Sequence, residues 1–252
     1  MKVSEQKLHS QITDGSSSAV ERYQSLALGS SSLYYLFKYE LIMMITCSMP
    51  GALGLVLRKA LYPRILGSVG RNVLFGRNVC IRHGKKIHIS DNVIIDDNVT
   101  LDAKGEGNAG ITVGSDCIIS KNVVLSCKSG DIALGTGCSV GINAVIHATE
   151  GSSVALGDHV LVAAFVYIMG SGKYGTEEPD ILFKDQGIYP QGGVNIESNV
   201  WIGSNAQIMD GVSIGTGSIV GSSSVVTRDV ASYDVVAGAP ARVIRSRKSP
   251  SS

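Results

Sequence analysis

The chain has 252 residues, of which 44% are hydrophobic and 17% charged, and its formal net charge is +1. This balance argues against a disordered chain and against a protein that follows nucleic-acid phosphates, which usually carries a basic domain or stripe. The 30 glycines are spread at regular intervals instead of being gathered in a linker, so we expect one main domain.

The cysteines and the N-terminus indicate a reducing compartment. Five cysteines without a CxxC pair predict neither a disulfide framework nor a zinc ribbon. Cys117 and Cys138 occupy positions where other repeats have valine or alanine, and we expect them to fill the core. The first residues, MKVSEQKLHSQITDGSSS, are polar and lack the apolar segment of a secretion signal. We therefore predict a cytoplasmic protein, or one at the inner face of the membrane.

Two segments precede the regular part of the chain. Residues 1–22 are polar and serine-rich and are predicted to be flexible. Residues 23–68 are apolar, and the uncharged run from Leu41 to Leu57 is interrupted by Pro50 and Gly51, which predicts two short helices rather than one membrane span. Two interpretations are compatible with these helices. In the first, the helices form a cap over the open first coil of a solenoid. In the second, they form an interfacial hairpin on a membrane, whose polar edge would consist of Tyr34, Tyr35, Lys38, Tyr39, Arg58 and Lys59.

A six-residue rhythm fills residues 69–231. Aliphatic or aromatic residues recur in groups of three, and any longer step falls after the third member of a group. The positions are Val69, Phe75, Ile81; Ile89, Ile95, Leu101; Val113, Ile119, Leu125; Leu134, Val140, Ile146; Leu156, Val162, Ile168; Ile196, Ile202, Ile208; and Ile214, Val220, Val226. This pattern predicts an all-β solenoid of about seven triangular coils, with one corner of each coil reserved for insertions.

The insertions follow Leu101, Leu125, Ile146 and Ile168. Because successive coils stack about 4.8 Å apart, all four are predicted to share one edge. The extended loop 169–195 is much the longest, and ordering that much backbone costs considerable conformational entropy, so we expect it to have a function. Residues 232–252 form a C-terminal segment with a basic tail.

The end of the repeat region carries a specific resemblance. NVWIGSNAQIMDGVSIGTGSIVGSSSVVTRDV is followed by VVAGAPARVIR, and the chain from Val69 to Arg247 resembles the hexapeptide-repeat acyltransferases, most closely the branch that O-acetylates sugars and polysaccharides. The resemblance implies a left-handed parallel β-helix, a homotrimer, and acetyl-CoA or another acyl-CoA as co-substrate. It also implies transfer of a short acyl group to a hydroxyl or amine of a sugar or lipid-linked glycan. In that family the long loop reaches the neighbouring subunit and helps form the active site.

That family places a histidine on the loop as general base, because an imidazole takes up protons near neutral pH. Here the position is held by Lys173, or by Tyr174 with a shift of one residue. Three interpretations stay open. In the first, His147, one coil below on the same edge, is the base. In the second, Lys173 or Tyr174 is the base, which requires a strongly lowered pKa. In the third, the base has been lost, and the protein is a binding or scaffold homologue.

The resemblance also implies binding residues. Asn143 matches an asparagine near the reaction centre, and Asp185 on the loop is a second substrate-binding candidate. The acyl-CoA is expected to run past Gly203, Ser204, Gly221 and Ser222, with its phosphates near Arg228, Arg242 and Arg245. His83 and His88 lie by an insertion corner two or three coils away, and His159 sits within a coil. A zinc lyase is known on the same fold, but its cluster of histidines is not evident in the sequence, so no metal site is predicted.

Overall fold

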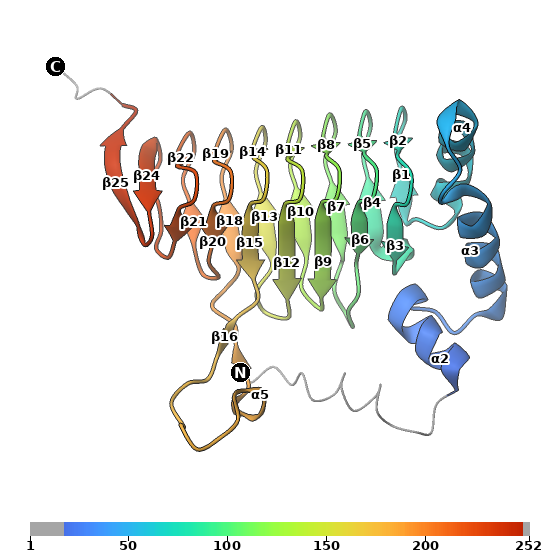
Figure 1. Ribbon diagram of the computed structural model, residues 1–252, viewed down its shortest axis with the longest axis horizontal. Coiled ribbons are helices and arrows are strands. Elements are labelled where there is room, and N and C mark those ends of the chain that lie inside the picture. Colours follow the sequence, from blue (N-terminus) through green and yellow to red (C-terminus); the bar gives the residue numbers. More distant parts are fainter. Residues whose placement is uncertain (1–17, 249–252) are drawn as a thin grey trace.

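The chain folds into a parallel β-helix whose N-terminal end is covered by helices (Figure 1). The computed structural model describes residues 18–248. The larger part of the segment predicted to be flexible, residues 1–17, lies outside the described residues.

Three parallel sheets form the three faces of the β-helix, and we number them I to III. Sheet I consists of β1 (Ser68–Val69), β4 (Ile87–Ile89), β7 (Ile111–Val113), β10 (Ile132–Leu134), β13 (Val154–Leu156), β18 (Val194–Ile196) and β21 (Ser213–Ile214). Sheet II consists of β2 (Leu74–Phe75), β5 (Ile94–Ile95), β8 (Ile118–Ile119), β11 (Ser139–Val140), β14 (Leu161–Val162), β19 (Trp201–Ile202), β22 (Ile219–Val220), β24 (Asp234–Gly238) and β25 (Ala241–Ser246). Sheet III consists of β3 (Cys80–Arg82), β6 (Thr100–Asp102), β9 (Val124–Lys128), β12 (Val145–Thr149), β15 (Tyr167–Gly170), β20 (Gln207–Ile208) and β23 (Val225–Val226).

The predicted fold class is confirmed. The three sheets make seven complete coils, in the repeat pattern expected of a left-handed β-helix, and β24 adds part of an eighth. At the C-terminal end β25 pairs antiparallel with β24, so the hairpin covers the edge that the last coil would otherwise expose.

The core follows the six-residue rhythm. Each position of the rhythm after Val69 is buried, and the central residues of neighbouring strands pair in register, as Ile95 does with Ile119. The small residues between them are also buried, including the thiols of Cys117 and Cys138. Near the last coils this position is serine, and the buried Ser218 hydroxyl donates to the Ala231 carbonyl at 2.8 Å. The hydrogen bond satisfies a polar group that would otherwise be costly to bury.

Four successive corners between sheets II and III each carry an asparagine. Asn78, Asn98, Asn122 and Asn143 have φ values of 55–61°, a left-handed conformation that asparagine tolerates better than most residues. Each side-chain amide donates to the next along the β-helix, with distances of 3.2, 3.1 and 2.9 Å. Such a ladder keeps successive corners aligned, which fixes where the strands of sheet III begin.

The four insertions follow β6, β9, β12 and β15, and a shorter one that contains the turn Gly84–Lys86 follows β3; all five are strands of sheet III. The prediction that they share one edge is therefore confirmed, and we call it the III–I edge. The longest insertion projects away from the β-helix, and its β16 and α5 are labelled in Figure 1. We call residues 171–193, which connect β15 to β18, the arm.

Helices lie across the N-terminal end of the β-helix (Figure 1). They are α2 (Ala19–Tyr23), the π-helical segment Gln24–Leu28, α3 (Leu33–Thr46), α4 (Gly51–Leu61) and the short 3₁₀ helix Tyr62–Arg64, and a further 3₁₀ turn, Gly84–Lys86, precedes β4. The inner face of α3 is buried through Tyr35, Tyr39, Ile42 and Thr46. Its phenols donate to carbonyls of the chain beneath, Tyr35 to Ile65 at 3.0 Å and Tyr39 to Ile81 at 2.6 Å. Among residues 18–248 no helix has the length and apolarity needed to cross a membrane.

Arg58 joins the two helices to the first coil. Its side chain is 2% exposed, and its Nε donates to the Phe75 carbonyl at 2.9 Å. Its Nη1 donates to the carbonyls of Thr46 and Met49 at 3.0 and 2.8 Å. Because Thr46 ends α3, the guanidinium also lies at the negative end of that helix's dipole. The prediction that Arg58, Tyr35 and Tyr39 form a polar edge is wrong. All three side chains are buried, and each donates a hydrogen bond to a backbone carbonyl.

Replacing Arg58 should undock the helices. The substitution Arg58→Met leaves three buried carbonyls without their donor, and we expect a loss of about 3 kcal/mol or more in the free energy of unfolding. Urea unfolding followed by circular dichroism measures this loss. Lys59→Met is the matched control, because Lys59 is the next residue of α4 and is exposed. Equal stability of the two variants would contradict the role of Arg58.

Candidate functional site

The arm begins and ends as a two-stranded hairpin. β16 (Lys173–Tyr174) pairs antiparallel with β17 (Ile188–Tyr189), with Lys173 opposite Tyr189 and Tyr174 opposite Ile188. Between these strands the chain forms the single-turn helix α5 (Phe183–Gln186). Gln186 is buried, and its amide donates to the carbonyls of Glu178 and Ile181 at 2.9 and 2.8 Å. The arm is therefore folded within itself as well as at its base.

One carboxylate holds both ends of the arm. Oδ2 of Asp210 accepts hydrogen bonds from the Gly172 amide at 2.9 Å and the Gln191 amide at 2.9 Å, and Oδ1 accepts one from the Gly193 amide at 2.8 Å. The buried Ser152 hydroxyl donates to the same Oδ2 at 2.8 Å. Bonds to an ionised acceptor are roughly twice as strong as neutral ones, so this residue is the main anchor of the arm.

Glycine is required where the arm rejoins the β-helix. Gly193 has a φ of 89°, and a Cβ there would lie 2.0 Å from the Ser153 carbonyl oxygen. No other residue could bring its amide this close to the Asp210 carboxylate.

His147 lies on the III–I edge beside the start of the arm. It is a half-buried residue of β12, and in the register of sheet III it pairs with Met169 above and Ser126 below. The next pair in this register is Ala148 with Gly170, the last residue before the arm. His147 is thus held by a regular strand at the base of the arm.

Lys173, Tyr174 and Asp185 all lie on the arm, and their side chains are exposed. Tyr174 is 48% exposed. A lysine or a phenol acts as a base near neutral pH only where burial or a charged neighbour favours its deprotonated form. Within one chain, the arm does not bury either side chain.

Asn143 lies at the opposite end of β12 from His147. Its amide oxygen accepts the hydrogen bond from Asn122 at 2.9 Å, so one function of this side chain is to continue the corner ladder. Four residue steps separate Asn143 from His147, which corresponds to about 13 Å of extended backbone. A single chain does not bring them to one point.

The residues expected to bind the donor divide between two edges and the C-terminal hairpin. Gly203, Ser204, Gly221 and Ser222 follow strands of sheet II, so they share the II–III edge with Asn143. A Cβ on Gly203 would lie 2.6 Å from the Ser222 amide nitrogen, so stacking of coils already explains this glycine. Arg228 follows β23 on the III–I edge, and Arg242 and Arg245 lie in β25.

The remaining histidines lie elsewhere. His83 is buried near the first coil, where its Nε2 lies 3.0 Å from the Ser25 carbonyl oxygen, and burial lowers the pKa of its imidazole. His88 lies 2.9 Å from the Ser68 hydroxyl, and His159 occupies a corner with a φ of 57°. Across residues 18–248 no group of three or more His, Cys, Asp or Glu side chains is arranged to hold a metal ion.

Sequence reasoning missed the anchor of the arm. Asp210 comes two residues after the buried Ile208, where an aspartate has no distinguishing sequence signal. Its partners Ser152 and Gly172 are 58 and 38 residues away in the chain. Only the register of the coils brings these groups together.

Comparisons with known proteins agree with the repeat and the fold. The model of the bacterial transferase hexapeptide (six repeats) matches residues 193–228, and that of the hexapeptide repeat of succinyl-transferase matches residues 68–103 and 132–169. A search of curated proteins finds no match. In these three stretches the chain therefore resembles hexapeptide-repeat transferases.

Two similar solved structures extend over most of the chain. The polySia specific acetyltransferase NeuO is 23% identical, with a TM-score of 0.51, over 71% of this chain and 80% of that one. AntD, an N-acyltransferase from Bacillus cereus in complex with dTDP and 3-hydroxybutyryl-CoA, is 21% identical, with a TM-score of 0.51, over 76% of this chain and 88% of that one. At these identities the likeness establishes the β-helix fold.

Loss of the Asp210 carboxylate should release the arm. In Asp210→Asn one oxygen becomes an NH₂ group that faces donors, so hydrogen exchange at Gly172, Gln191 and Gly193 should accelerate by about tenfold or more. Exchange followed by mass spectrometry of peptides from residues 171–193 measures this change. Asp229→Asn is the matched control, because Asp229 also follows a sheet III strand but accepts the Ser213 amide at 2.8 Å and does not hold the arm. Unchanged exchange in the arm of Asp210→Asn would refute the anchor.

Proposed function

We propose that this protein is an acyltransferase that moves an acetyl or other short acyl group from acyl-CoA to a hydroxyl or amine of a sugar or lipid-linked glycan. The observation that carries the proposal is the anchored arm, which leaves a hexapeptide β-helix directly beside His147. Ordering an arm of this length costs conformational entropy, and a carboxylate with four donors holds it at one point of the III–I edge. The reaction class is supported by the likeness to NeuO, a polySia specific acetyltransferase, and to AntD, an N-acyltransferase.

His147 is the residue we assign as general base. It lies on a strand packed between two others, so its position is better fixed than that of a side chain on the arm. In the proposed step the imidazole accepts the proton of the acceptor hydroxyl while the oxygen attacks the thioester carbonyl. The C–S bond then breaks, the acyl group remains on the acceptor, and the proton passes from the imidazolium to the leaving thiolate of CoA.

The donor is assigned to a groove along the last coils. Arg228, Arg242 and Arg245 are exposed, and within residues 18–248 none of them has a carboxylate at ion-pair distance. Their guanidinium groups are therefore available for the phosphates of CoA. The exposed Ser204 and Ser222 would line the II–III edge along which the pantetheine runs, with Gly203 and Gly221 beside them.

A homotrimer would bring the two edges together. Asn143 and the glycine–serine positions lie on the II–III edge, whereas His147, Asp185 and the arm belong to the III–I edge. If the II–III edge of one subunit faces the III–I edge of the next, each of the three interfaces contains the residues of both edges. Asn143 and Asp185 would then hold the acceptor from two different subunits.

Two exposed apolar surfaces support contact between subunits. A ladder of outward-facing residues along sheet II includes the exposed pairs Ile94 with Ile118 and Leu161 with Trp201. Ser139 lies between the two pairs. The tip of the arm exposes three consecutive apolar residues, Ile181, Leu182 and Phe183. A monomer would leave both surfaces in water, and such patches usually mark an interface.

The alternative is a non-catalytic homologue that keeps the ligand groove as a binding or scaffold protein. It is favoured by one observation, the exposed Lys173 and Tyr174 at the positions where a loop histidine is expected. The zinc lyase considered above has no support from the described residues, and neither proposed function uses a metal.

Activity distinguishes the two candidates. Purified protein with acetyl-CoA and a panel of sugars and lipid-linked glycans should release free thiol only when an acceptor is present. His147→Ala should lower kcat by about a hundred- to ten-thousandfold with little change in acyl-CoA binding, because it removes the base but not the groove.

Three further variants complete this test. His159→Ala is the matched control and should leave the rate unchanged. Lys173→His and Tyr174→His should give no large gain if His147 is the base. A gain of a hundredfold or so from either, or acyl-CoA binding without turnover by the native chain, would favour the homologue that has lost its base.

Charge introduced into the apolar ladder should separate the subunits. Trp201→Lys and Leu182→Asp place a charge where apolar contact is proposed, and each should shift the protein from trimer to monomer in sedimentation velocity. Ile244→Asp, at an exposed position of β25, is the control. A native chain that sediments as a monomer would contradict the trimer. If Trp201→Lys stays trimeric, the sheet II ladder is not part of the interface, and if Leu182→Asp stays trimeric, the tip of the arm is not.

A further inference from the structure

Helix α3 is apolar on both of its faces. Its inner face is buried on the β-helix through Tyr35, Tyr39 and Ile42. The opposite face carries Tyr34, Phe37 and Met44, which are 78%, 71% and 79% exposed, and also Leu41 and Ile45. A helix that only caps a solenoid needs one apolar face, with polar residues on the other.

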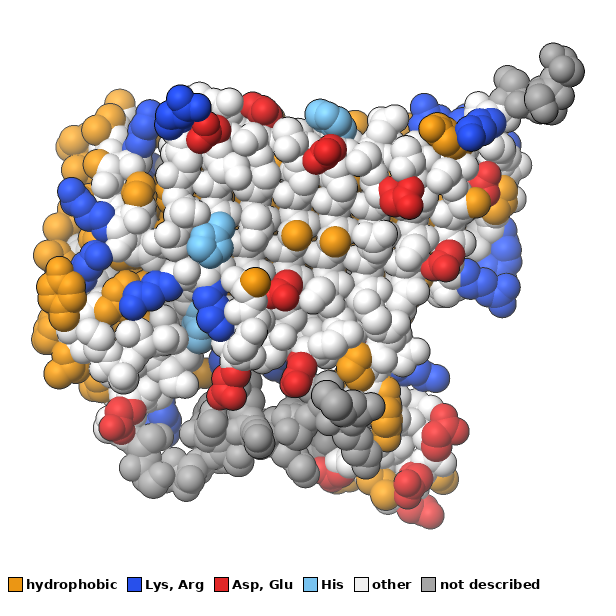
Figure 2. Space-filling model, turned by 180° about the vertical axis from the view of Figure 1, so that it is seen from behind, with side chains coloured by type: hydrophobic (Ala, Val, Ile, Leu, Met, Phe, Trp, Pro, Cys, Tyr) orange, Lys and Arg blue, Asp and Glu red, His pale blue; other side chains and the backbone are white. Residues whose placement is uncertain are grey.

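Helix α4 continues this surface. Leu53 and Val56 lie three residues apart, so they share one side of the helix, and both are exposed. Figure 2 shows hydrophobic side chains gathered over the helical end of the molecule, with Lys and Arg side chains among them. We call the exposed side of α3, α4 and the turn Tyr62–Arg64 the cap surface.

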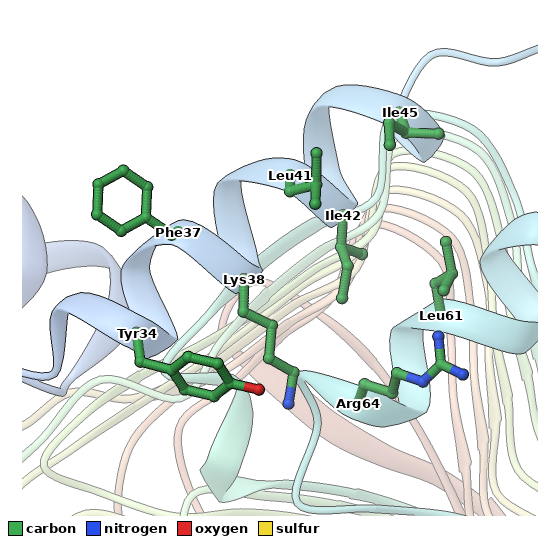
Figure 3. A pocket seen from close by; sticks show the side chains of 8 residues that line it. All are labelled: Tyr34, Phe37, Lys38, Leu41, Ile42, Ile45, Leu61 and Arg64. Atoms are coloured by element: carbon green, nitrogen blue, oxygen red, sulfur yellow. The ribbon is translucent and has the colours of Figure 1, made fainter.

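The cap surface contains a hollow with two cationic residues at its border. The hollow has a volume of about 530 Å³, and its walls are mainly apolar, from Phe37, Leu41, Ile42, Ile45 and Leu61. Lys38 and Arg64 extend from α3 and from the turn after α4 along one side of it, next to Tyr34 (Figure 3). Within residues 18–248 neither cation has a carboxylate at ion-pair distance.

The charges on this surface have one dominant sign. Lys38, Lys59 and Arg64 are at least partly exposed, whereas Glu40 is the one acidic residue from 33 to 64, and it accepts a hydrogen bond from Tyr23. Apolar side chains among unpaired cations match an interface that is anionic outside and apolar beneath.

We propose that the cap surface docks on an anionic lipid bilayer. Phe37, Leu41, Met44, Leu53 and Val56 would lie among the acyl chains. The apolar hollow would receive part of one lipid's acyl chain, and the phosphate of that lipid would contact Lys38 and Arg64 at the border. Tyr34 has an apolar ring and a polar hydroxyl, which suits the boundary between headgroups and acyl chains. The surface is independent of acyl transfer and acts without acyl-CoA.

Other occupants fit this surface less well. A second copy would bring Lys38, Lys59 and Arg64 of both chains into one interface with little acidic charge to offset them, and this excess of like charge disfavours pairing. Residues 1–17 of the same chain are mostly polar, with Val3, Leu8 and Ile12 as their aliphatic residues, and they offer little to fill an apolar surface of this extent.

Vesicle flotation of the full-length protein tests the proposal. Without acyl-CoA, the protein should float with vesicles of phosphatidylcholine and phosphatidylglycerol and bind weakly to phosphatidylcholine alone. Phe37→Ser combined with Met44→Ser should reduce the partition coefficient by about tenfold or more, because two exposed apolar side chains leave the bilayer. Both residues are largely exposed, so the fold should survive, and circular dichroism and unfolding verify this.

The matched variants separate the two parts of the surface. Lys38→Gln with Arg64→Gln should abolish the preference for anionic vesicles and its sensitivity to salt. Phe165→Ser and Lys121→Gln, at exposed positions of the β-helix, should bind as the native chain does.

Three results would overturn the proposal. The first is a native protein that does not float with anionic vesicles. The second is binding that the Phe37 and Met44 variant leaves intact, or that Phe165→Ser reduces equally. The third is a lipid-free protein whose sedimentation the Phe37 and Met44 variant changes, because the cap surface would then join two copies of the chain.

Discussion

The rest of the structure depends on the register between successive coils. Each inward side chain stacks on its equivalent one coil away, and each strand hydrogen-bonds to the strands above and below it. A coil that contained an extra residue within a face would move every following side chain to the wrong side of its sheet. Extra residues are therefore confined to corners, and in this chain the insertions use the III–I edge. The same constraint that makes the core regular thus determines where irregular, functional backbone can be placed.

An insertion of this length gains function only if its position is fixed. The Asp210 carboxylate fixes the arm by itself. It lies on a corner of the β-helix and accepts hydrogen bonds from both ends of the arm and from the buried Ser152. The arm then adds its own hairpin and the contacts of Gln186. The base of the arm is consequently tied to the β-helix at both ends, whereas the apolar tip at Leu182 is exposed.

The features that repeat were predictable from the sequence, and those that occur once were not. The aliphatic rhythm predicted the three sheets, the coil number and the edge of the insertions, since each depends on spacing alone. Arg58 was assigned to a polar edge because arginine is rarely buried, yet three carbonyls at a helix end and a strand satisfy it there. Asp210 could not be found, because its role depends on residues distant in sequence. The candidate site residues stay a prediction, since His147 and Asn143 lie on different edges and would meet only through a second copy of the chain.

The cap surface and the arm lie at a defined separation along the β-helix. α3 and α4 lie across the end of the solenoid at its first coil, and the arm leaves from the fifth strand of sheet III (Figure 1). Four steps of about 4.8 Å separate these coils, or roughly 19 Å. The helical layer adds about 10 Å to this distance, so with the cap surface on a bilayer the arm would stand beyond the reach of a lipid headgroup. An acceptor carried on a membrane lipid would therefore have to present its reactive hydroxyl well out along a glycan. In a trimer with parallel β-helices all three cap surfaces would face the same bilayer, so weak single contacts would add to stable attachment.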